Sequence, residues 1–393
     1  MNIMGIMRSH MDASKDIVRL IRELYGQNKA FIPLHAPVFL GNEKKYLKEC
    51  IDSTFVSYVG KYVTQFEDQI AKFTGAKYAV AMVNGTTALQ VALQLAGVKR
   101  GDEVVTQALT FVASANAITH AGGIPVFVDV EEDTLGMSPD ALRTWLESNS
   151  EMDRKTKRCM NKNTGKVISA IVPMHTFGHP CRIEEIVKVA AEFGILVVED
   201  AAESLGSYYK GKHTGTFGLL GIISFNGNKT ITTGGGGMLI TDNEQMAIRA
   251  KHITTTAKVP HPWEFVHDEI GHNFRMTNVN AAIGVGQMEK IDVYLENKRE
   301  TAEAYATFCQ EQGIDFVPGL TESKTNNWLN AIILEDRSMR DDFLTYTNGH
   351  GVMTRPIWNL INKLEMYKNC QHDGLKNSQW LEDRVVNIPS GFR

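Results

Sequence analysis

The chain has 393 residues, of which 43% are hydrophobic and 22% charged, as is usual for a soluble globular protein. Its length suits two or three domains, or one large domain with an appendage. The formal net charge of −4 offers no broad basic field for nucleic acid or an anionic membrane. The five cysteines are scattered, so we expect reduced thiols and no disulfide, zinc or iron–sulfur framework.

No targeting or membrane signal stands out in the sequence. Residues 1–11 lack the apolar run of a secretory signal peptide, and no segment approaches the length of a membrane span. We therefore expect a cytoplasmic protein with neither nucleic acid nor membrane as a partner. The basic stretch at residues 154–158 could contact phosphates, although a solvated loop between two elements is the simpler interpretation.

Short apolar strands alternate with helices through most of the chain. Helical spacing predicts helices over residues 16–25, 42–53, 66–73, 88–96, 113–121 and 183–193. Strands are predicted over residues 103–106, 125–129, 167–172, 195–198, 221–225 and 237–241. This order predicts an α/β fold, with a mostly parallel sheet covered by helices on both faces.

The pattern changes from about residue 277. Residues 279–311 form one long helical stretch that we expect to be broken or bent, and strands at 330–334 and 352–355 flank a helix at 343–350. These elements predict a smaller α+β domain. We thus divide the chain into an N-terminal helical segment (1–30), a large domain (31–270) and a small C-terminal domain (271–393).

A lysine and an aspartate follow two of the predicted strands. Lys229 lies between Ser224-Phe-Asn-Gly-Asn and a run of four glycines, Gly234 to Gly237, and Asp200 ends the strand at residues 195–198. A lysine after a strand is commonly solvated, and an aspartate there could simply cap a helix. Together, however, they suit pyridoxal 5′-phosphate (PLP), where the lysine forms the Schiff base and the carboxylate partners the pyridinium nitrogen.

Further polar residues follow other strand ends, where ligands of parallel sheets bind. Gly85, Thr86 and Thr87 open a helix and could hold the cofactor phosphate, although such a turn is also an ordinary helix cap. Ser224 is a second candidate phosphate donor. Phe111 could stack on the pyridine ring or belong to the core.

His175 and Glu203 leave two interpretations each. His175 follows the strand at residues 167–172 and is either a substrate-binding residue or a structural hydrogen-bonding residue. Glu203 lies one turn beyond Asp200 and could reach the ring-hydroxyl side of the cofactor. Glu199 points to the other side on strand alternation, so we expect it to be structural, like His179.

Over about residues 32–389, the chain resembles the DegT/DnrJ/EryC1 family of PLP-dependent nucleotide-sugar aminotransferases. The motifs that carry the resemblance are Gly60-Lys-Tyr-Val-Thr-Gln-Phe-Glu67, Asn84-Gly-Thr-Thr-Ala-Leu89, Glu199-Asp-Ala-Ala-Glu-Ser204, Ser224-Phe-Asn-Gly-Asn-Lys229 and residues 273–282. The resemblance implies the aspartate-aminotransferase fold (PLP fold type I). It also implies that Lys229 is the Schiff-base lysine, Asp200 the partner of the ring nitrogen, and Phe111 the stacking ring.

The resemblance further implies a homodimer with shared active sites. Asn273, with Arg275, would then reach the phosphate region of the neighbouring subunit. Thr86, Thr87 and Ser224 would be phosphate ligands. Glu203 stands where the family usually has glutamine or histidine, which leaves its contact to the ring hydroxyl open.

Within the family, residues 224–238, 353–363 and 381–390 look most like the LegC branch. That branch uses L-glutamate to aminate C4 of a UDP-linked 4-keto-6-deoxy-N-acetylhexosamine on the way to legionaminic acid, and the bacillosamine and GDP-perosamine enzymes share much of the pattern. Arg355 and Trp358 are candidate nucleotide or sugar contacts, with a structural salt bridge and a core tryptophan as alternatives.

Three rival functions remain at this stage. A sugar dehydratase of the same family would have histidine in place of the lysine, whereas this chain keeps Lys229. A non-catalytic PLP-binding sensor or regulatory protein would be expected to lose Lys229 or Asp200, and both are present. A plain structural or binding protein would be purified without a visible cofactor band.

Overall fold

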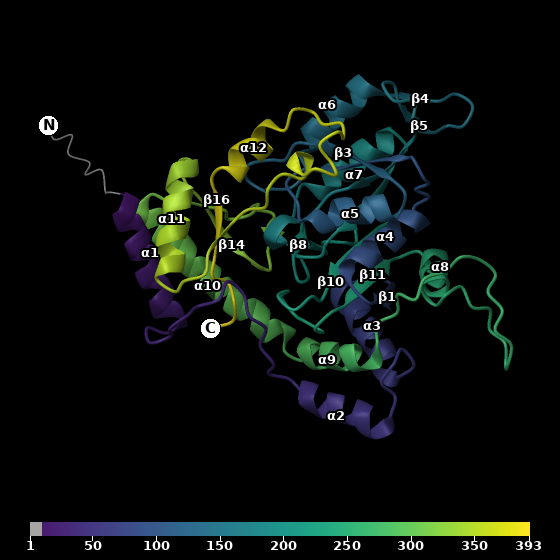
Figure 1. The fold of residues 1–393 in the computed structure, drawn as a ribbon, viewed down its shortest axis with the longest axis horizontal. Helices are drawn as coiled ribbons and strands as arrows, with labels where there is room; N and C mark the ends of the chain where they lie inside the picture. Colours follow the sequence, from purple (N-terminus) through teal and green to yellow (C-terminus); the bar gives the residue numbers. More distant parts are fainter. Residues whose placement is uncertain (1–9) are drawn as a thin grey trace.

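The structure, a computed structural model, describes residues 10–393. Within that range a seven-stranded sheet forms the centre of the molecule, in the strand order β1-β11-β10-β7-β6-β2-β3 (Figure 1). Neighbouring strands are parallel except that β11 is antiparallel to both β1 and β10, which confirms the mostly parallel sheet. The bounds are β1 (Tyr78–Met82), β2 (Glu103–Gln107), β3 (Ile124–Val128), β6 (Ile168–Val172), β7 (Leu196–Asp200), β10 (Leu220–Ser224) and β11 (Gly237–Thr241).

Helices bury both faces of this sheet. One face packs on α4, α5 and α8, and the other on α3 and α9 beside β10 and β11 and on α6 and α7 beside β2, β3, β6 and β7. Successive residues of one strand therefore serve different cores: Val198 packs on the first face and Val197 on the second. The helices are α2 (Glu43–Ser53), α3 (Lys61–Thr74), α4 (Gly85–Leu95), α5 (Val112–His120), α6 (Pro139–Asn149), α7 (Ile183–Glu192), α8 (Glu244–Thr254) and α9 (Asn278–Met288).

A four-stranded antiparallel sheet, in the order β12-β14-β16-β15, lies in the C-terminal part of the described chain. Helices α1 and α11 pack side by side at this end of the molecule, and the core there also includes residues of α10 (Figure 1). The bounds are α1 (His10–Tyr25), α10 (Ile291–Gln312), α11 (Arg337–Gly349), α12 (Lys376–Glu382), β12 (Asp315–Phe316), β14 (Asn330–Ile333), β15 (Arg355–Pro356) and β16 (Val385–Ile388).

Short elements complete the fold. Strand β13, from the C-terminal part of the chain, pairs with β8, which follows β7 of the larger sheet. The bounds are β4 (Ser150–Met152), β5 (Cys159–Asn161), β8 (Tyr208–Tyr209), β9 (Lys212–His213), β13 (Ser323–Lys324) and the 3-10 turns η1 (Thr176–Gly178) and η2 (Ile361–Lys363).

The long helical stretch is divided, as expected, between α9 and α10, with a break at Glu289 and Lys290. Helices α6, α8 and α12 were not predicted, nor were strands β1 and β16 and the short strands β4, β5, β8, β9, β12 and β13. β1 is alanine-rich and gains its place by pairing with β11, which is distant in the sequence. The division at residues 30 and 270 stays a prediction: residues 1–9 lie outside the described range, and α9 packs on α2 and α3 from the preceding part.

All five cysteines are free thiols. In the part of the chain that the structure describes, no helix has the length and apolar character required to span a membrane.

Candidate active site

A cavity of about 320 Å³ lies beyond the carboxyl ends of the parallel strands. Seven of the predicted cofactor and catalytic residues line it, together with Trp358. They are Gly85, Thr86, Phe111, Asp200, Glu203, Ser224 and Lys229. A larger hollow of about 920 Å³ lies beside α11 and α12, but its described lining has no lysine, histidine or cysteine. The smaller cavity therefore has the chemistry that the sequence predicts.

Lys229 follows β10 after a short turn and points its amine at a buried acid. Its Nζ lies 3.0 Å from Oε1 of Glu203 and 3.8 Å from the ring centroid of Trp328. The other oxygen of Glu203 accepts a hydrogen bond from the Phe177 backbone N–H at 2.9 Å. Burial raises the pKa of the Glu203 carboxyl, and the Lys229 charge opposes this rise.

Asp200 is the last residue of β7 and is 4% exposed. One carboxylate oxygen accepts a hydrogen bond from Ser114 Oγ at 2.7 Å and the other from the Ala202 backbone N–H at 3.2 Å. Burial raises the pKa of Asp200, while the Ser114 hydrogen bond lowers it. A buried carboxylate at a cavity wall is suited to a cationic or N–H partner.

The N-terminus of α4 forms another wall of the cavity. Asn84 caps this helix through a hydrogen bond from the Thr87 backbone N–H at 2.8 Å, and Gly85 and Thr86 line the cavity. A Cβ on Gly85 would lie only 3.0 Å from Cβ of Ser224, so the helix start and the end of β10 are packed closely. Thr87 does not line the cavity, because its hydroxyl donates to the Asn84 carbonyl at 3.0 Å.

In the glycine run after Lys229, Gly237 is the position where a side chain would clash with the backbone of another element. Gly237 pairs with both Met82 and Ser224 in the sheet, and a Cβ there would lie 2.4 Å from the backbone of Asn84. For Gly235, by contrast, the nearest atom to an added Cβ is 4.0 Å away.

Gly237→Ala should therefore destabilise the protein by about 1–3 kcal/mol, since the α4 start must move away from β11. It should also weaken phosphate or PLP binding to the purified protein. Gly235→Ala is the matched control and should change the free energy of unfolding by less than about 1 kcal/mol. Denaturant titration of both variants checks this, and equal losses would contradict it.

Aromatic rings close the cavity on the side of Phe111. This ring is 49% exposed, and its centroid lies 6.2 Å from that of Trp358. Trp358 also packs on buried Phe177, with ring centroids 5.0 Å apart. Phe111 is thus available to a planar ligand rather than buried in the core, and Trp358 faces the same space.

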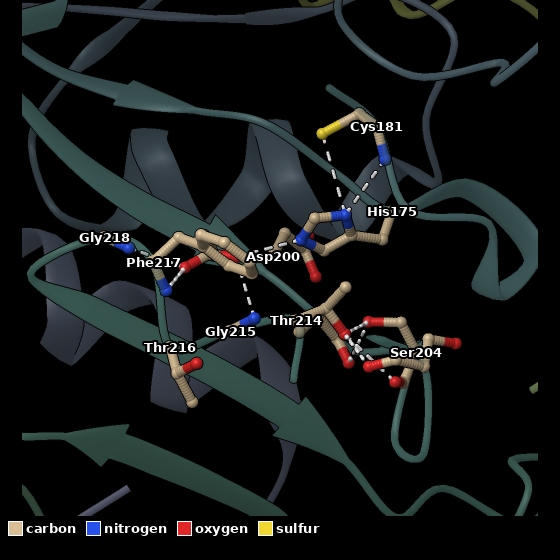
Figure 2. A network of polar contacts seen from close by, with 12 residues as sticks. His175, Cys181, Asp200, Ser204, Thr214, Gly215, Thr216, Phe217 and Gly218 are labelled. Carbon is tan, nitrogen blue, oxygen red and sulfur yellow. Dashed lines mark hydrogen bonds and ion pairs between the residues drawn. The ribbon is translucent and has the colours of Figure 1, made fainter. Parts of the chain in front are cut away.

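His175 does not line the cavity, contrary to the substrate-binding hypothesis. It is fully buried, with Nε2 3.1 Å from Glu199 and Nδ1 accepting from the Cys181 backbone N–H at 3.3 Å (Figure 2). Glu199 also accepts three backbone N–H groups, as its structural interpretation anticipated. These groups belong to Gly215, Phe217 and Gly218. The network holds the loop after β9 against β7, and both ring nitrogens of His175 have hydrogen-bond partners within it.

Asn273 and Arg355 also lie away from this cavity. Asn273 is exposed and accepts a hydrogen bond from Arg275 at 3.2 Å, and the Arg275 guanidinium covers the Tyr58 ring. Arg355 is exposed and donates to Asn348 at 2.9 Å, and no ion pair of Arg355 occurs within residues 10–393. The salt-bridge alternative for Arg355 therefore has no support.

Three residues that contact Asp200, Glu203 or Lys229 were not predicted from the sequence: Ser114, Phe177 and Trp328. Ser114 could have been found, because it lies one turn after Phe111 at the start of a helix that follows a strand. Phe177 has a left-handed backbone (φ 57°), a strain that residues near functional sites often carry. Trp328 comes from a segment about 100 residues away, so no local pattern connects it with Lys229.

A second buried lysine, Lys298 on α10, lies behind the site. Its Nζ is 2.7 Å from His35 Nε2, 2.7 Å from the Ser390 carbonyl and 3.3 Å from the Trp328 carbonyl. Burial lowers the pKa of Lys298 to about 7 and holds that of His35 well below its usual value.

This shift predicts how stability depends on pH. Between pH 7 and 10.5 the unfolded chain binds a proton at Lys298 that the native chain lacks, so the free energy of unfolding rises with pH. The slope from this one group is at most about 1.4 kcal/mol per pH unit. Wild type should therefore gain stability relative to Lys298→Met between about pH 6.5 and 9 in urea titrations. The exposed Lys188→Met is the control, and a flat difference for Lys298→Met would refute the shift.

Comparison with known proteins agrees with this geometry. The family described as "DegT/DnrJ/EryC1/StrS aminotransferase family" matches residues 40–392. GDP-perosamine synthase of Escherichia coli O157:H7 is 37% identical over 365 residues, covering 92% of this chain and 93% of the relative. EpsN of Bacillus subtilis (strain 168) is 36% identical, covering 92% and 91%; its name gives a class, pyridoxal phosphate-dependent aminotransferase, and no substrate.

Among solved structures, the aminotransferase TlmJ from Streptoalloteichus hindustanus superposes with a TM-score of 0.81. It is 25% identical, and the alignment covers 92% of this chain and 93% of TlmJ. The family match spans both sheets and the cavity between the strand ends and Trp358. The chain therefore belongs to the DegT/DnrJ/EryC1/StrS aminotransferase family and is a PLP-dependent aminotransferase.

Proposed function

We propose that this chain transfers the amino group of L-glutamate to C4 of a nucleotide-linked 4-keto-6-deoxy sugar, for use in a surface polysaccharide. The observation that carries the proposal is the Lys229 amine beside buried Glu203, in one cavity with the Asp200 carboxylate. We favour the GDP-linked 4-keto-6-deoxymannose, because GDP-perosamine synthases from three organisms are among the relatives of this chain.

The residues around the cavity fit PLP. A primary amine, a buried carboxylate and the N-terminus of an eleven-residue helix all face one space of about 320 Å³. Gly85 packs closely against Ser224, so the start of α4 lies next to the end of β10. Backbone N–H groups at a helix start are suited to holding a phosphate group. When bound, PLP supplies an electron sink that stabilises negative charge at the carbon losing its proton.

Each residue then has a defined task. Lys229 attaches the cofactor, and as a free amine it takes the proton from the donor Cα and delivers one to sugar C4. Asp200, held by Ser114, would partner the ring nitrogen and keep it protonated. Gly85, Thr86 and Ser224 would hold the phosphate. The Thr87 side chain is left out of this assignment, because its hydroxyl donates to the Asn84 carbonyl.

Two outer walls complete the assignment. Phe111 covers one face of the ring, and Trp358 beside it is positioned to contact the sugar. Glu203 lies beside the Lys229 amine, which supports its assignment to the side of the cofactor that carries the ring hydroxyl.

The UDP-linked 4-keto-6-deoxy-N-acetylhexosamine, used in legionaminic acid or bacillosamine pathways, is the second candidate. Its support is the similarity of residues 353–363 and 381–390 to the LegC branch. Mass spectrometry of parallel incubations with PLP, L-glutamate and each keto-sugar separates the two. Amine from the GDP sugar alone supports our proposal, and amine from the UDP sugar alone favours the LegC-like branch. Bound PLP without amine from either would point to another keto-sugar or to a non-catalytic role.

We also propose a homodimer in which Asn273 and Arg275 complete the partner's site. Its support is the exposure of Asn273 and a set of exposed apolar side chains in the last turn of α2 and just after it. That set consists of Ile51, Phe55, Val56, Tyr58 and Val59. One chain has a mass of 43.7 kDa, and sedimentation velocity should give a species of twice that mass. A monomer that turns over at full rate would refute the shared site.

A further inference from the structure

Residues 326–328, which precede β14, form a clip on the two loops that carry Glu203 and Lys229. The Asn326 side chain is 1% exposed and donates to the Glu203 carbonyl at 2.8 Å, to the Leu205 carbonyl at 2.9 Å and to Thr230 Oγ1 at 3.2 Å. Asn326 therefore fixes the distance between the loop of the acid and the loop of the amine.

The same side chain sets the position of Trp328. Oδ1 of Asn326 accepts the Trp328 backbone N–H at 2.9 Å, and Asn327 between them has a left-handed backbone (φ 48°). The fit around Asn326 is tight, because a Cβ on Gly178 (φ 94°) would lie 1.8 Å from Oδ1.

Trp328 is held from two more directions. Its indole N–H donates to the carbonyl of Asn228, the residue before Lys229, at 2.6 Å. Its own carbonyl accepts from the buried Lys298 at 3.3 Å. The ring is 4% exposed and presents its face to Nζ of Lys229 at 3.8 Å. An ammonium over an aromatic face is stabilised most when both are shielded from water.

We propose that Trp328 is a positioning residue for Lys229: its ring face and the Glu203 carboxylate together form a two-sided seat for the amine whenever Lys229 is not bonded to the cofactor. The proposal rests on the proposed function, in which Lys229 is released and rebound in each turnover. The seat keeps Nζ beside the cavity, so the amine does not drift between proton transfers.

The test compares Trp328→Phe, which keeps a ring face, with Trp328→Met, which keeps bulk without one. Full-length protein freed of PLP is labelled briefly with acetic anhydride, and Lys229 is quantified against exposed Lys188 by peptide mass spectrometry. We expect Lys229 labelling to rise about tenfold in Trp328→Met and to stay within about twofold of wild type in Trp328→Phe.

Steady-state kinetics supply the second readout. In Trp328→Met, kcat should fall about tenfold while KM for L-glutamate stays within about twofold, because the donor itself is not held by the ring. Trp380→Leu, a tryptophan on α12 remote from the cavity lining, should leave both readouts unchanged.

Labelling of Lys229 in Trp328→Met at the wild-type level, or equal labelling in the Met and Phe variants, would overturn the seat. Thermal unfolding verifies the fold, and Trp328→Leu takes the place of the Met variant if that protein does not fold. The labelling needs no keto-sugar, so a wrong substrate assignment leaves this test intact.

Discussion

Lys229→Ala should abolish amino transfer, with a loss of at least about 1,000-fold in kcat, while the protein remains folded. In the proposed function the substitution removes both the amine that attaches the cofactor and the group that moves the proton, and no other lysine lines the described cavity. The Lys229 side chain is 13% exposed and lies at the cavity wall, so its loss creates little unfilled core volume.

Two measurements check this expectation. Borohydride reduction followed by intact-protein mass spectrometry should leave the cofactor mass on wild type and not on Lys229→Ala, and thermal unfolding should report a folded variant. Lys188→Ala, an exposed lysine on α7, should match wild type in both. Turnover of Lys229→Ala at the wild-type rate would refute the assignment.

Asp200→Ala should weaken PLP retention and lower kcat by about 100-fold or more. In the proposed function the buried carboxylate keeps the ring nitrogen protonated, and preorganised electrostatic partners of this kind are worth about 10²–10³ in rate. Ser114 would also lose its acceptor, leaving a buried hydroxyl without its strongest partner.

Equilibrium dialysis against PLP and single-turnover kinetics with L-glutamate separate the two effects. Asp200→Asn keeps an acceptor for Ser114 while removing the charge, so it should be as slow as the alanine variant if the charge is what matters. Asp140→Ala on α6, exposed and distant from the cavity lining, is the control. An unchanged rate in Asp200→Ala would remove Asp200 from the site.

The alternation of strands and helices in the larger sheet and several polar residues of the cavity wall could be predicted from sequence alone. Apolar strands alternating with helices require a parallel sheet, and in such a sheet the ends of β7 and β10 must lie at one edge. Asp200 and the turn that carries Lys229 are therefore brought to the same edge of the sheet. The close packing at Gly237 could also be expected from the sequence, because a run of glycines has a high conformational-entropy cost unless the backbone must approach another group closely.

The direction of single side chains needed the tertiary structure. His175 follows a strand end as Asp200 does, yet its imidazole is taken up by Glu199 and Cys181, away from the cavity. Thr87 and Thr86 are neighbours in one turn, but only Thr86 lines the cavity, since Thr87 is committed to the helix cap. The position of a residue in the chain determines at which edge of the sheet it lies. The hydrogen-bond partners available there determine the direction in which its side chain points.

The sequence by itself determined the fold class and the family and predicted the lysine and aspartate of the site, because short-range patterns and the geometry of parallel strands specify them. Only the tertiary structure revealed Trp328 and Lys298 behind Lys229. These residues come from segments some 70 to 100 positions away, and their placement depends on how the C-terminal elements pack against the larger sheet. Contacts between such distant segments are decided by packing and buried hydrogen bonds, which leave no periodic trace in the sequence.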